Sequence, residues 1–175
     1  MFDLCLITPA QLTEVAAFYV SLDAQTRYSR FFAHLSDYAI FDRVLQLNLD
    51  KSFLVGARKS GALVGVVEAG LYGDTAELGV AVSEVCRGMG VGQLLCHYAI
   101  SVAHERSARH IEVITSYSNT PMQRLALRAG MQASRVDGDW HGDMQLSEDR
   151  PASHRGCLSR GPAVAAPHRE SLPQV

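Results

Sequence analysis

The sequence VSEVCRGMGVGQLL, which covers residues 82–95, decides the fold of this chain. It places Gly88, Gly90 and Gly92 between a β-rich run and an apolar stretch with helical spacing. Glycine tolerates positive φ and allows the backbone to approach a ligand closely. A helix that begins directly after such a loop presents unpaired N–H groups and the positive end of its dipole. The loop therefore predicts an anion site, suited to a phosphate or a pyrophosphate.

Three phosphate-binding patterns compete for this loop. A Walker A loop needs Gly-Lys-Ser/Thr after its glycines, whereas Gly92 is followed by Gln93. A dinucleotide fingerprint that starts at Gly88-x-Gly90 needs a small residue at position 93, where this chain has glutamine. The third pattern, R/Q-x-x-G-x-G/A, is filled at every place by Arg87, Gly90 and Gly92.

The residues on either side of the loop predict alternating strands and helices in the order β-α-α-α-β-β-β-α-β-α-β-β. The predicted strands cover residues 2–7, 52–58, 62–72, 75–82 and 110–116, with a closing hairpin of 131–137 and 140–146. The predicted helices cover residues 9–19, 28–35, 37–49, 93–106 and 120–129. Trp140 is expected to pack within the closing hairpin.

The composition indicates one packed domain followed by a tail. The chain has 175 residues, of which 47% are hydrophobic and 19% charged, and this suits a single core. From Ser147 onward there is no Phe, Tyr or Trp, and four of the six prolines lie there. Such a segment cannot bury enough apolar surface to offset its ordering entropy. We therefore expect a domain over residues 1–146 and a disordered or loosely attached tail over residues 147–175.

The charge and the cysteine pattern exclude several classes of protein. The formal net charge of −2 argues against a broad basic face for nucleic acid. The four cysteines are scattered without a C-x-x-C pair, and no Cys/His group has zinc spacing. The N-terminus lacks the positive region of a signal peptide, and no apolar run reaches the roughly 20 residues of a membrane helix. We expect a cytoplasmic protein with reduced thiols that uses no metal, nucleic acid or membrane.

Two motifs together resemble the GNAT superfamily of N-acetyltransferases. Residues 82–95 are similar to the acetyl-CoA-binding motif of that family. The sequence NTPMQRLALRAGM, residues 119–131, is similar to its later motif, in which an Asn opens a helix that ends in Gly and an apolar residue. Asn119, Leu125, Gly130 and Met131 occupy the matching places. The similarity extends over residues 54–146 and is weaker upstream.

The resemblance implies an α/β (α+β) fold with a mixed, mostly antiparallel central sheet of six to seven strands. Helices would flank this sheet, and the sheet would be splayed at the acyl-CoA site. The implied activity is that of an enzyme, an acyl-CoA-dependent N-acetyltransferase. It would move an acetyl group from acetyl-CoA to a primary amine by direct attack in a ternary complex.

The resemblance also assigns cofactor contacts. Backbone N–H groups of residues 88–92 would hold the CoA pyrophosphate, and the pantetheine would lie between the strands that end near Val82 and Ser116. Asn119 would form a hydrogen bond near the thioester. Arg87 would either pin the loop or reach a CoA phosphate, and both roles stay open. The implied cofactor-binding residues are Val80, Val82, Arg87, Gly88, Met89, Gly90, Val91, Gly92 and Asn119.

Glu77 is the candidate general base. A lysine-type amine has a solution pKa of roughly 10.4, so it must lose a proton before it attacks a thioester. In the strand of residues 76–82, Glu77 shares a face with Gly79 and Ala81, whose small size leaves room for a substrate. The resemblance agrees, because many members carry a glutamate base on this strand. The alternative is that Glu77 is only a solvated residue at the edge of the sheet. Glu68, which could line the acceptor cleft, and Glu84 are weaker candidates for the general base.

The chain departs from the family pattern at the general acid. Many members carry a Tyr after the Leu of the second motif, to protonate the departing thiolate. This chain has Ala126 at that place. The alternative proton donors are Tyr117, Ser116, Ser118 and water.

The acceptor is expected to be a protein lysine. Met122, Ala126 and the segment TRYSRFFAHL, residues 26–35, resemble the GNAT domain of Pat-type bacterial protein lysine acetyltransferases. A polyamine, antibiotic or amino acid is the alternative acceptor, and the family is compatible with a homodimer. Because Ala126 stands in place of the Tyr, the alternative to an enzyme is a non-catalytic module that senses acyl-CoA. Arg27 and Arg30 would either meet an acidic substrate or a CoA phosphate, or form a solvated face.

Overall fold

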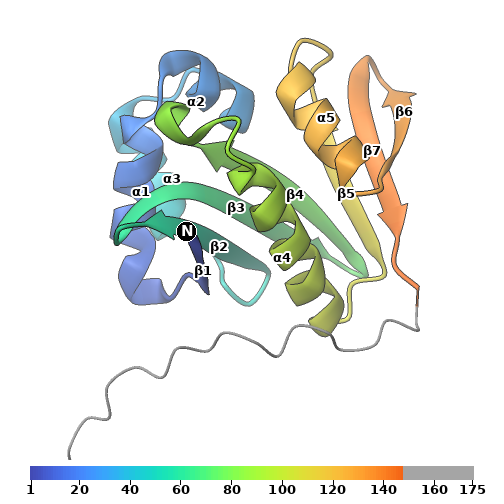
Figure 1. Ribbon diagram of the computed structural model, residues 1–175, viewed down its shortest axis with the longest axis horizontal. Helices are drawn as coiled ribbons and strands as arrows, with labels where there is room; N and C mark the ends of the chain where they lie inside the picture. Colours follow the sequence, from blue (N-terminus) through green and yellow to red (C-terminus); the bar gives the residue numbers. More distant parts are fainter. Residues whose placement is uncertain (148–175) are drawn as a thin grey trace, which may run out of the picture.

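The computed structural model describes residues 1–147 as one seven-stranded sheet with helices on both faces (Figure 1). The described strands lie in the order β1-β2-β3-β4-β5-β7-β6, and each neighbouring pair is antiparallel except β4 with β5. The strands are β1 (Asp3–Leu6), β2 (Ser52–Lys59), β3 (Ala62–Tyr72), β4 (Thr75–Val82), β5 (His110–Thr115), β6 (Gln132–Val136) and β7 (Asp139–Gln145). This arrangement confirms the mixed, mostly antiparallel sheet that the sequence predicts.

The helices alternate with the strands in the predicted order, apart from two additional short 3₁₀ turns. The helices are α1 (Leu12–Ser21), α2 (Ala24–Phe31), α3 (Asp37–Leu45), α4 (Val91–Glu105) and α5 (Thr120–Arg128), and the 3₁₀ turns are η1 (Pro9–Gln11) and η2 (Glu84–Cys86). Side-chain caps start three of the described helices, α2, α3 and α5. Ser36 Oγ accepts a hydrogen bond of 3.2 Å from the amide of Ala39, and Asn119 Oδ1 accepts one of 3.3 Å from the amide of Met122.

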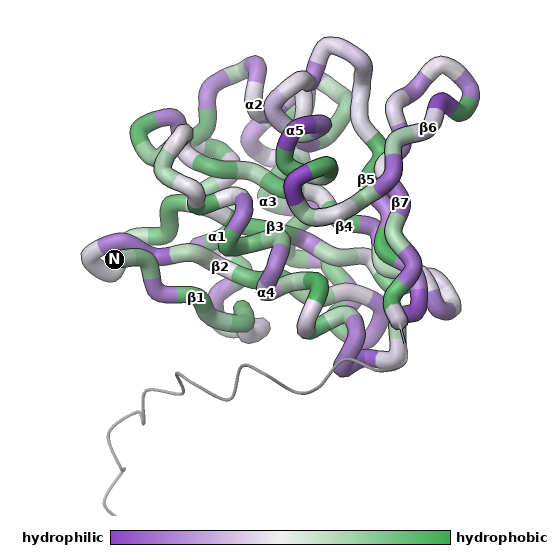
Figure 2. The backbone as a smooth tube through the Cα atoms, turned by 45° about the vertical axis from the view of Figure 1, so that its right-hand side comes forward, coloured by the Kyte–Doolittle hydropathy of each residue, from purple (hydrophilic) through white to green (hydrophobic). Residues whose placement is uncertain are grey.

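Two hydrophobic cores lie on opposite faces of the sheet. Neighbouring residues of β3 serve different cores, because side chains alternate along a strand. Val67 packs in the core that contains Leu95 of α4, whereas Val66 packs in the core that contains Tyr19 of α1 and Val44 of α3. Figure 2 shows the central strands β2 and β3 mostly in the hydrophobic colour, as expected for strands buried on both faces.

The sheet opens between β4 and β5. In the described chain these two strands pair only from Thr75 to Glu77, opposite His110 to Glu112. Beyond these positions β4 continues to Val82 and pairs only with β3, while β5 pairs with β7. The two ribbons diverge visibly in Figure 1. The predicted splay is therefore present, and it begins at Glu77.

The last strand ends at Gln145, two residues before the end of the described chain. The domain boundary at residue 146 stays a prediction. The predicted tail over residues 147–175 lies outside the described residues, except for Ser147. Among the described helices, none combines the length and the apolar character needed to cross a bilayer.

Candidate active site

A cleft of about 1260 Å³ lies where β4 and β5 separate. The second half of β4, the glycine loop and the first residues of α4 form one side of it. The end of β5 and α5 form the opposite side, and α2 contributes a further wall. The cleft thus joins two segments that are 27 residues or more apart in the sequence, Gly90 to Gly92 and Asn119 to Leu125.

The glycine loop presents open backbone at the head of α4. Gly88 has φ of +73° and Gly90 has φ of +80°, and no described atom lies within 4 Å of a Cβ built at either position. Gly90 is the N-cap residue, so it offers no side chain to the first amides of the helix. The amides of Val91, Gly92 and Gln93 therefore lack an intrahelical acceptor and sit at the positive end of the helix dipole. This geometry fits a bound anion such as a pyrophosphate.

Gly92 has a packing role instead. A Cβ at this position would lie 3.3 Å from Cδ2 of Leu125, so the absence of a side chain allows α5 to approach α4. Val91 is buried and fixes the start of the helix in the core below. Of the predicted cofactor-binding residues, Met89 alone is not among the described residues that line the cleft, and its side chain is exposed.

Val80 and Val82 lie on the cleft side of β4 and are partly buried against the core beneath α4. Their strand pairs with β3 on one side only, because β5 has already diverged. The backbone edge that faces the cleft can therefore pair with the amide groups of an extended ligand. This arrangement fits the predicted strand-like course of a pantetheine chain.

Glu77 is partly buried, lines the cleft and occupies the last position at which β4 and β5 pair. Glu112 is its register neighbour on β5, on the same face of the sheet, and bonds with Nδ1 of His141 at 3.1 Å. The expected room above Gly79 is occupied, because a Cβ there would lie 2.8 Å from the guanidinium carbon of Arg30. The small residue on this strand thus accommodates an arginine rather than a substrate.

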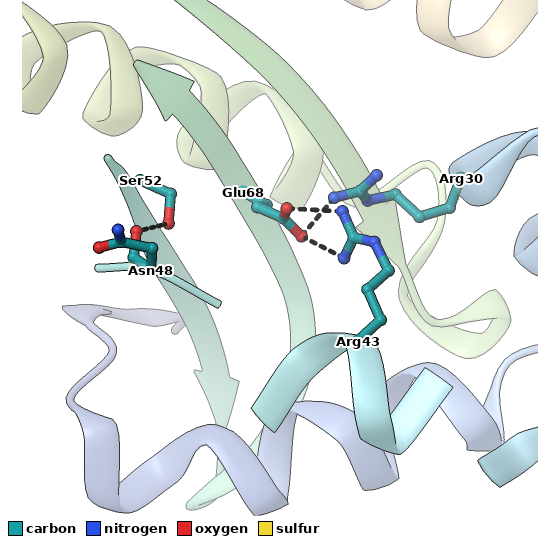
Figure 3. Close-up of polar contacts among 5 residues, drawn as sticks. All are labelled: Arg30, Arg43, Asn48, Ser52 and Glu68. Carbon is teal, nitrogen blue, oxygen red and sulfur yellow. Dashed lines mark hydrogen bonds and ion pairs between the residues drawn. The ribbon is translucent and has the colours of Figure 1, made fainter. Parts of the chain in front are cut away.

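Glu68 belongs to a buried ion cluster rather than to the cleft lining (Figure 3). Its carboxylate accepts hydrogen bonds from Arg30 at 2.6 Å and from Arg43 at 2.8 and 3.1 Å. Burial alone would raise the pKa of Glu68, but the two guanidinium groups outweigh it and hold the pKa below the ordinary value of 4.5. Glu68 is therefore a structural anion, while Glu84 is exposed in η2.

The arginines of the 26–35 segment are bound within the chain. Arg27 donates to the carbonyl of Leu35 at 2.8 Å and pairs with Asp37 at 2.8 Å. Arg30 is nearly buried beside Glu68 and also lines the cleft. Neither side chain forms a freely solvated face.

Asn119 caps α5 and also connects it to β5. Its Oδ1 accepts from Met122, and its Nδ2 donates to Oγ1 of Thr115 at 2.9 Å. Thr115 lines the cleft at the end of β5. The asparagine therefore fixes the distance between the strand end and the helix start, at the place where the thioester is predicted.

The candidate proton donors differ in position. Ser118 lines the cleft, and its hydroxyl lies 2.8 Å from that of Ser116. Tyr117 is half-exposed, and its ring contacts the guanidinium of Arg135 instead. Ser118 is therefore better placed than Tyr117 to protonate a group in the cleft.

The place of the family's tyrosine is closed in this chain. Ala126 is completely buried, and the ring of Trp140 packs over Gly142 directly beside it. Trp140 is 6% exposed, which confirms the prediction that it packs in the closing hairpin. A tyrosine at position 126 would need the volume that the indole already fills.

Several lining residues were not identified from the sequence. Arg124 and Arg128 line the cleft from α5, and their spacing of four residues was a readable signal of one helix face. Arg43 gave no such signal, because its role depends on a partner in another element. Within residues 1–147 no cluster of three or more His, Cys, Asp or Glu side chains is placed to hold a metal.

A mixed sheet split between two parallel strands, with a glycine loop at the head of a helix, matches the arrangement that the sequence resemblance implies for an acyl-CoA-binding enzyme. The profile of the Acetyltransferase (GNAT) family matches residues 15–131, and the chain belongs to this family of N-acetyltransferases. No curated protein sequence matches the chain.

Solved structures share the fold at low sequence identity. The GNAT domain of S. lividans PAT has a TM-score of 0.72 and 23% identity, over 82% of this chain and 89% of that domain. The ribosomal-protein-alanine N-acetyltransferase from Brucella melitensis has a TM-score of 0.66 and 19% identity, over 82% and 99% of the two chains. The PaiA N-acetyltransferase from Thermoplasma acidophilum, solved in complex with coenzyme A, has a TM-score of 0.66 and 10% identity, over 83% and 99%.

Proposed function

We propose that this protein transfers an acetyl group from acetyl-CoA to a primary amine, by direct attack while both substrates occupy the cleft. The observation that carries the proposal is that the open helix head at Gly90 and the carboxylate of Glu77 line the same cleft. One end of the cleft can thus hold a diphosphate, and the other end holds a base.

The glycine loop is the proposed anchor of the coenzyme. Amides of residues 88–92 would donate to the pyrophosphate, and the free edge of β4 at Val80 and Val82 would pair with the pantetheine. Asn119, which already fixes the end of β5, would orient the acyl end. Acetyl-CoA supplies an acetyl group that is activated as a thioester.

Glu77 is the proposed general base. It would accept the proton of the amine directly or through a water, a role that contributes about 10²–10⁴-fold to a rate. Its partly buried position at the start of the splay supports this role, because it limits access of bulk water to the reacting groups. Ser118, bonded to Ser116, is the proposed donor of a proton to the departing thiolate.

A protein lysine is the proposed acceptor. The fold likeness to the S. lividans PAT domain supports it, together with the 26–35 segment, which forms a cleft wall through residues such as Arg30 and Phe31. A small amine is the second candidate. A non-catalytic acyl-CoA sensor is the alternative of another class, and its motivation remains Ala126 at the place of the tyrosine. A homodimer and a cytoplasmic location stay predictions.

Thiol release tests the proposed function. Full-length protein is incubated with acetyl-CoA and a panel of lysine peptides, proteins and small amines, and free CoA thiol is measured. Acceptor-dependent release supports the enzyme. Binding of CoA by calorimetry without release from any acceptor would support the sensor instead.

The variant Glu77→Gln tests whether the carboxylate of Glu77 acts as the general base. We expect kcat to fall by about 10²–10⁴-fold, most visibly at low pH, with CoA affinity nearly unchanged. Glu112→Gln is the matched control, because Glu112 is the register neighbour on the same face but does not line the cleft. Unchanged turnover in Glu77→Gln, or an equal loss in both variants, would remove Glu77 from the mechanism.

A further inference from the structure

The side chain of Arg87 contacts α2 rather than the loop that it opens. Its Nη2 lies 2.5 Å from Oδ2 of Asp23 and also donates to Oγ1 of Thr26. The two partners stand 64 and 61 residues earlier in the chain. Of the two roles that the sequence leaves open for Arg87, pinning the loop therefore agrees with its contacts. The guanidinium joins the coenzyme loop to a different wall of the cleft.

Asp23 holds the start of α2. It is the N-cap residue, and its Oδ1 accepts from the amide of Thr26 at 2.9 Å while its Oδ2 accepts from the Thr26 hydroxyl at 2.6 Å. These bonds to Thr26, followed by the bond from Arg87, lower the pKa of Asp23 to about 2. The carboxylate is therefore ionised throughout the pH range in which an amine acetyltransferase is assayed, so the ion pair with Arg87 persists.

The first half of helix α2 depends on polar contacts for its position. None of its eight described residues is fully buried, although the helix lines the cleft with Gln25, Thr26 and Ser29. Its second half is held by the bond of Arg30 to Glu68 and by the ring of Phe31, which packs against Tyr19. An element with little buried apolar surface unfolds locally at a low free-energy cost. Each of these polar contacts therefore contributes strongly to keeping α2 ordered.

We propose that Arg87 is a positioning residue that couples coenzyme binding to the order of the acceptor-side wall, α2. Fixing the backbone of residues 88–92 fixes Arg87, and Arg87 fixes Asp23 at the start of the wall. This inference rests on the proposed function, because it takes the glycine loop as the coenzyme site. By thermodynamic linkage the coupling is reciprocal. The factor by which bound coenzyme raises the affinity for an acceptor equals the factor by which bound acceptor raises the affinity for the coenzyme.

The size of the coupling follows from the exposure of the pair. The side chains of Arg87 and Asp23 are 46% and 34% exposed, so solvent screens their attraction. We expect a coupling of about fivefold, at the lower end of the usual range for linked sites.

Hydrogen exchange with CoA as the probe tests the coupling directly. CoA is added to wild type, Arg87→Ala and Asp23→Asn, and exchange is followed in peptides that cover residues 23–32 and 88–95. Asp23→Asn keeps an oxygen that can cap the helix but removes the charge. Arg58→Ala is the matched control, since Arg58 forms an ion pair of the same length, 2.5 Å, with Glu14 on α1.

In the wild type and in Arg58→Ala, CoA is expected to slow exchange in both segments, by about fivefold in residues 23–32. In Arg87→Ala and Asp23→Asn, CoA should slow only residues 88–95, with Kd for CoA raised by no more than about fivefold, the size of the coupling. Arg87→Lys should restore part of the protection of α2, because the ammonium retains the charge opposite Asp23.

Protection of residues 23–32 that survives in Arg87→Ala, or that never appears in the wild type, would overturn the inference. A loss of CoA affinity of about a hundredfold in Arg87→Ala alone would also overturn it, because Arg87 would then bind the coenzyme itself. Failure of the wild type to bind CoA at all would instead refute the proposed function and remove the basis of this inference. The measurement thus distinguishes the two failures.

Discussion

Gly90 and Gly61 provide a matched pair that separates backbone strain from ligand binding. Gly90 has φ of +80° at the head of α4, and Gly61 has φ of +83° in the hairpin between β2 and β3. No described atom lies within 4 Å of a Cβ built at either position. Gly90→Ala and Gly61→Ala therefore impose the same conformational cost, but only the first places a methyl group in the proposed coenzyme site.

The stability cost is set by the left-handed backbone. A residue with a Cβ in this region costs about 1–2 kcal/mol relative to glycine. For a chain of 175 residues, 1 kcal/mol corresponds to a shift in Tm of about 2–4 °C. Both variants should therefore melt about 2–8 °C below wild type, as measured by differential scanning calorimetry.

The affinity cost is expected in Gly90→Ala alone. The methyl group would occupy the open space beside the first amides of α4 and displace a pyrophosphate from them. Hydrogen bonds to a charged group contribute about 1.5–3 kcal/mol each, so the loss of two costs about 3–6 kcal/mol. This loss corresponds to roughly 10²–10⁴-fold in Kd for CoA, measured by isothermal calorimetry at fixed salt.

The reasoning would be refuted if Gly90→Ala and Gly61→Ala lost the same stability and both kept wild-type affinity for CoA. That result would mean that the open side of the loop is not where an anion binds. An equal loss of affinity in both variants would also refute it, because the effect would then come from general destabilisation.

Three further changes have expected outcomes. Glu68→Gln should lower the free energy of unfolding by about 3–5 kcal/mol in urea, because it replaces the carboxylate that bonds to the buried Arg30 with a neutral amide. The pKa of Glu68 is lowered from 4.5 in the folded state, so ionised Glu68 contributes to the free energy of unfolding above pH 4.5, and this contribution is lost as the pH falls further. The free energy of unfolding of Glu68→Gln should therefore depend less on pH in the acid range. Burial raises the pKa of Cys96 to about 12, so iodoacetamide at pH 8 should leave Cys96 unmodified in the folded protein and alkylate it after unfolding, as read by peptide mass spectrometry. Ala126→Tyr should destabilise the fold by about 1–3 kcal/mol without raising kcat, and adding Trp140→Ala should recover part of the loss.

Each of these expectations has a clear contrary result. An unfolding free energy in Glu68→Gln equal to that of wild type would mean that the buried ion cluster is not a structural requirement. Rapid alkylation of Cys96 in the folded state would contradict its burial. A stable Ala126→Tyr variant with higher kcat would show that the tyrosine position is open and merely unused.

The order of the elements could be predicted because its signals are local. Asn119 followed by Pro121 marks the start of α5, and the Gly61 turn marks the β2–β3 hairpin. Such signals depend on a few neighbouring residues and survive in any tertiary context. The buried face of a helix follows less directly from the sequence: Leu94 and Tyr98 share the helical spacing of the apolar residues in α4, yet they are 44% and 38% exposed. Cys96 and Ile100 are buried, because the packing of α4 against the sheet and not hydropathy alone decides which stripe is covered.

The ion cluster and the Arg87 tie could not be predicted, because both join residues that are far apart in the chain. Arg30 is 38 residues from Glu68, and Arg87 is 64 residues from Asp23. Sequence reasoning left Arg30 between a ligand contact and a solvated face, and it left Arg87 between pinning the loop and reaching a CoA phosphate. The structure adds the partners, Glu68 and Asp23, and both contacts hold one wall of the cleft against another element.

Glycines in and near this site have different physical causes, and the causes predict different mutants. Gly79 is required by a neighbour, because a Cβ there would meet the guanidinium of Arg30 at 2.8 Å. Gly61 is required by a turn, since its φ is positive and its surroundings are open. Gly88 and Gly90 share both properties of Gly61, so neither positive φ nor open space can by itself mark a ligand site. What distinguishes them is their position, at the positive end of a helix that opens into the cleft, where the proposed pyrophosphate would fill the open space beside the unpaired amides.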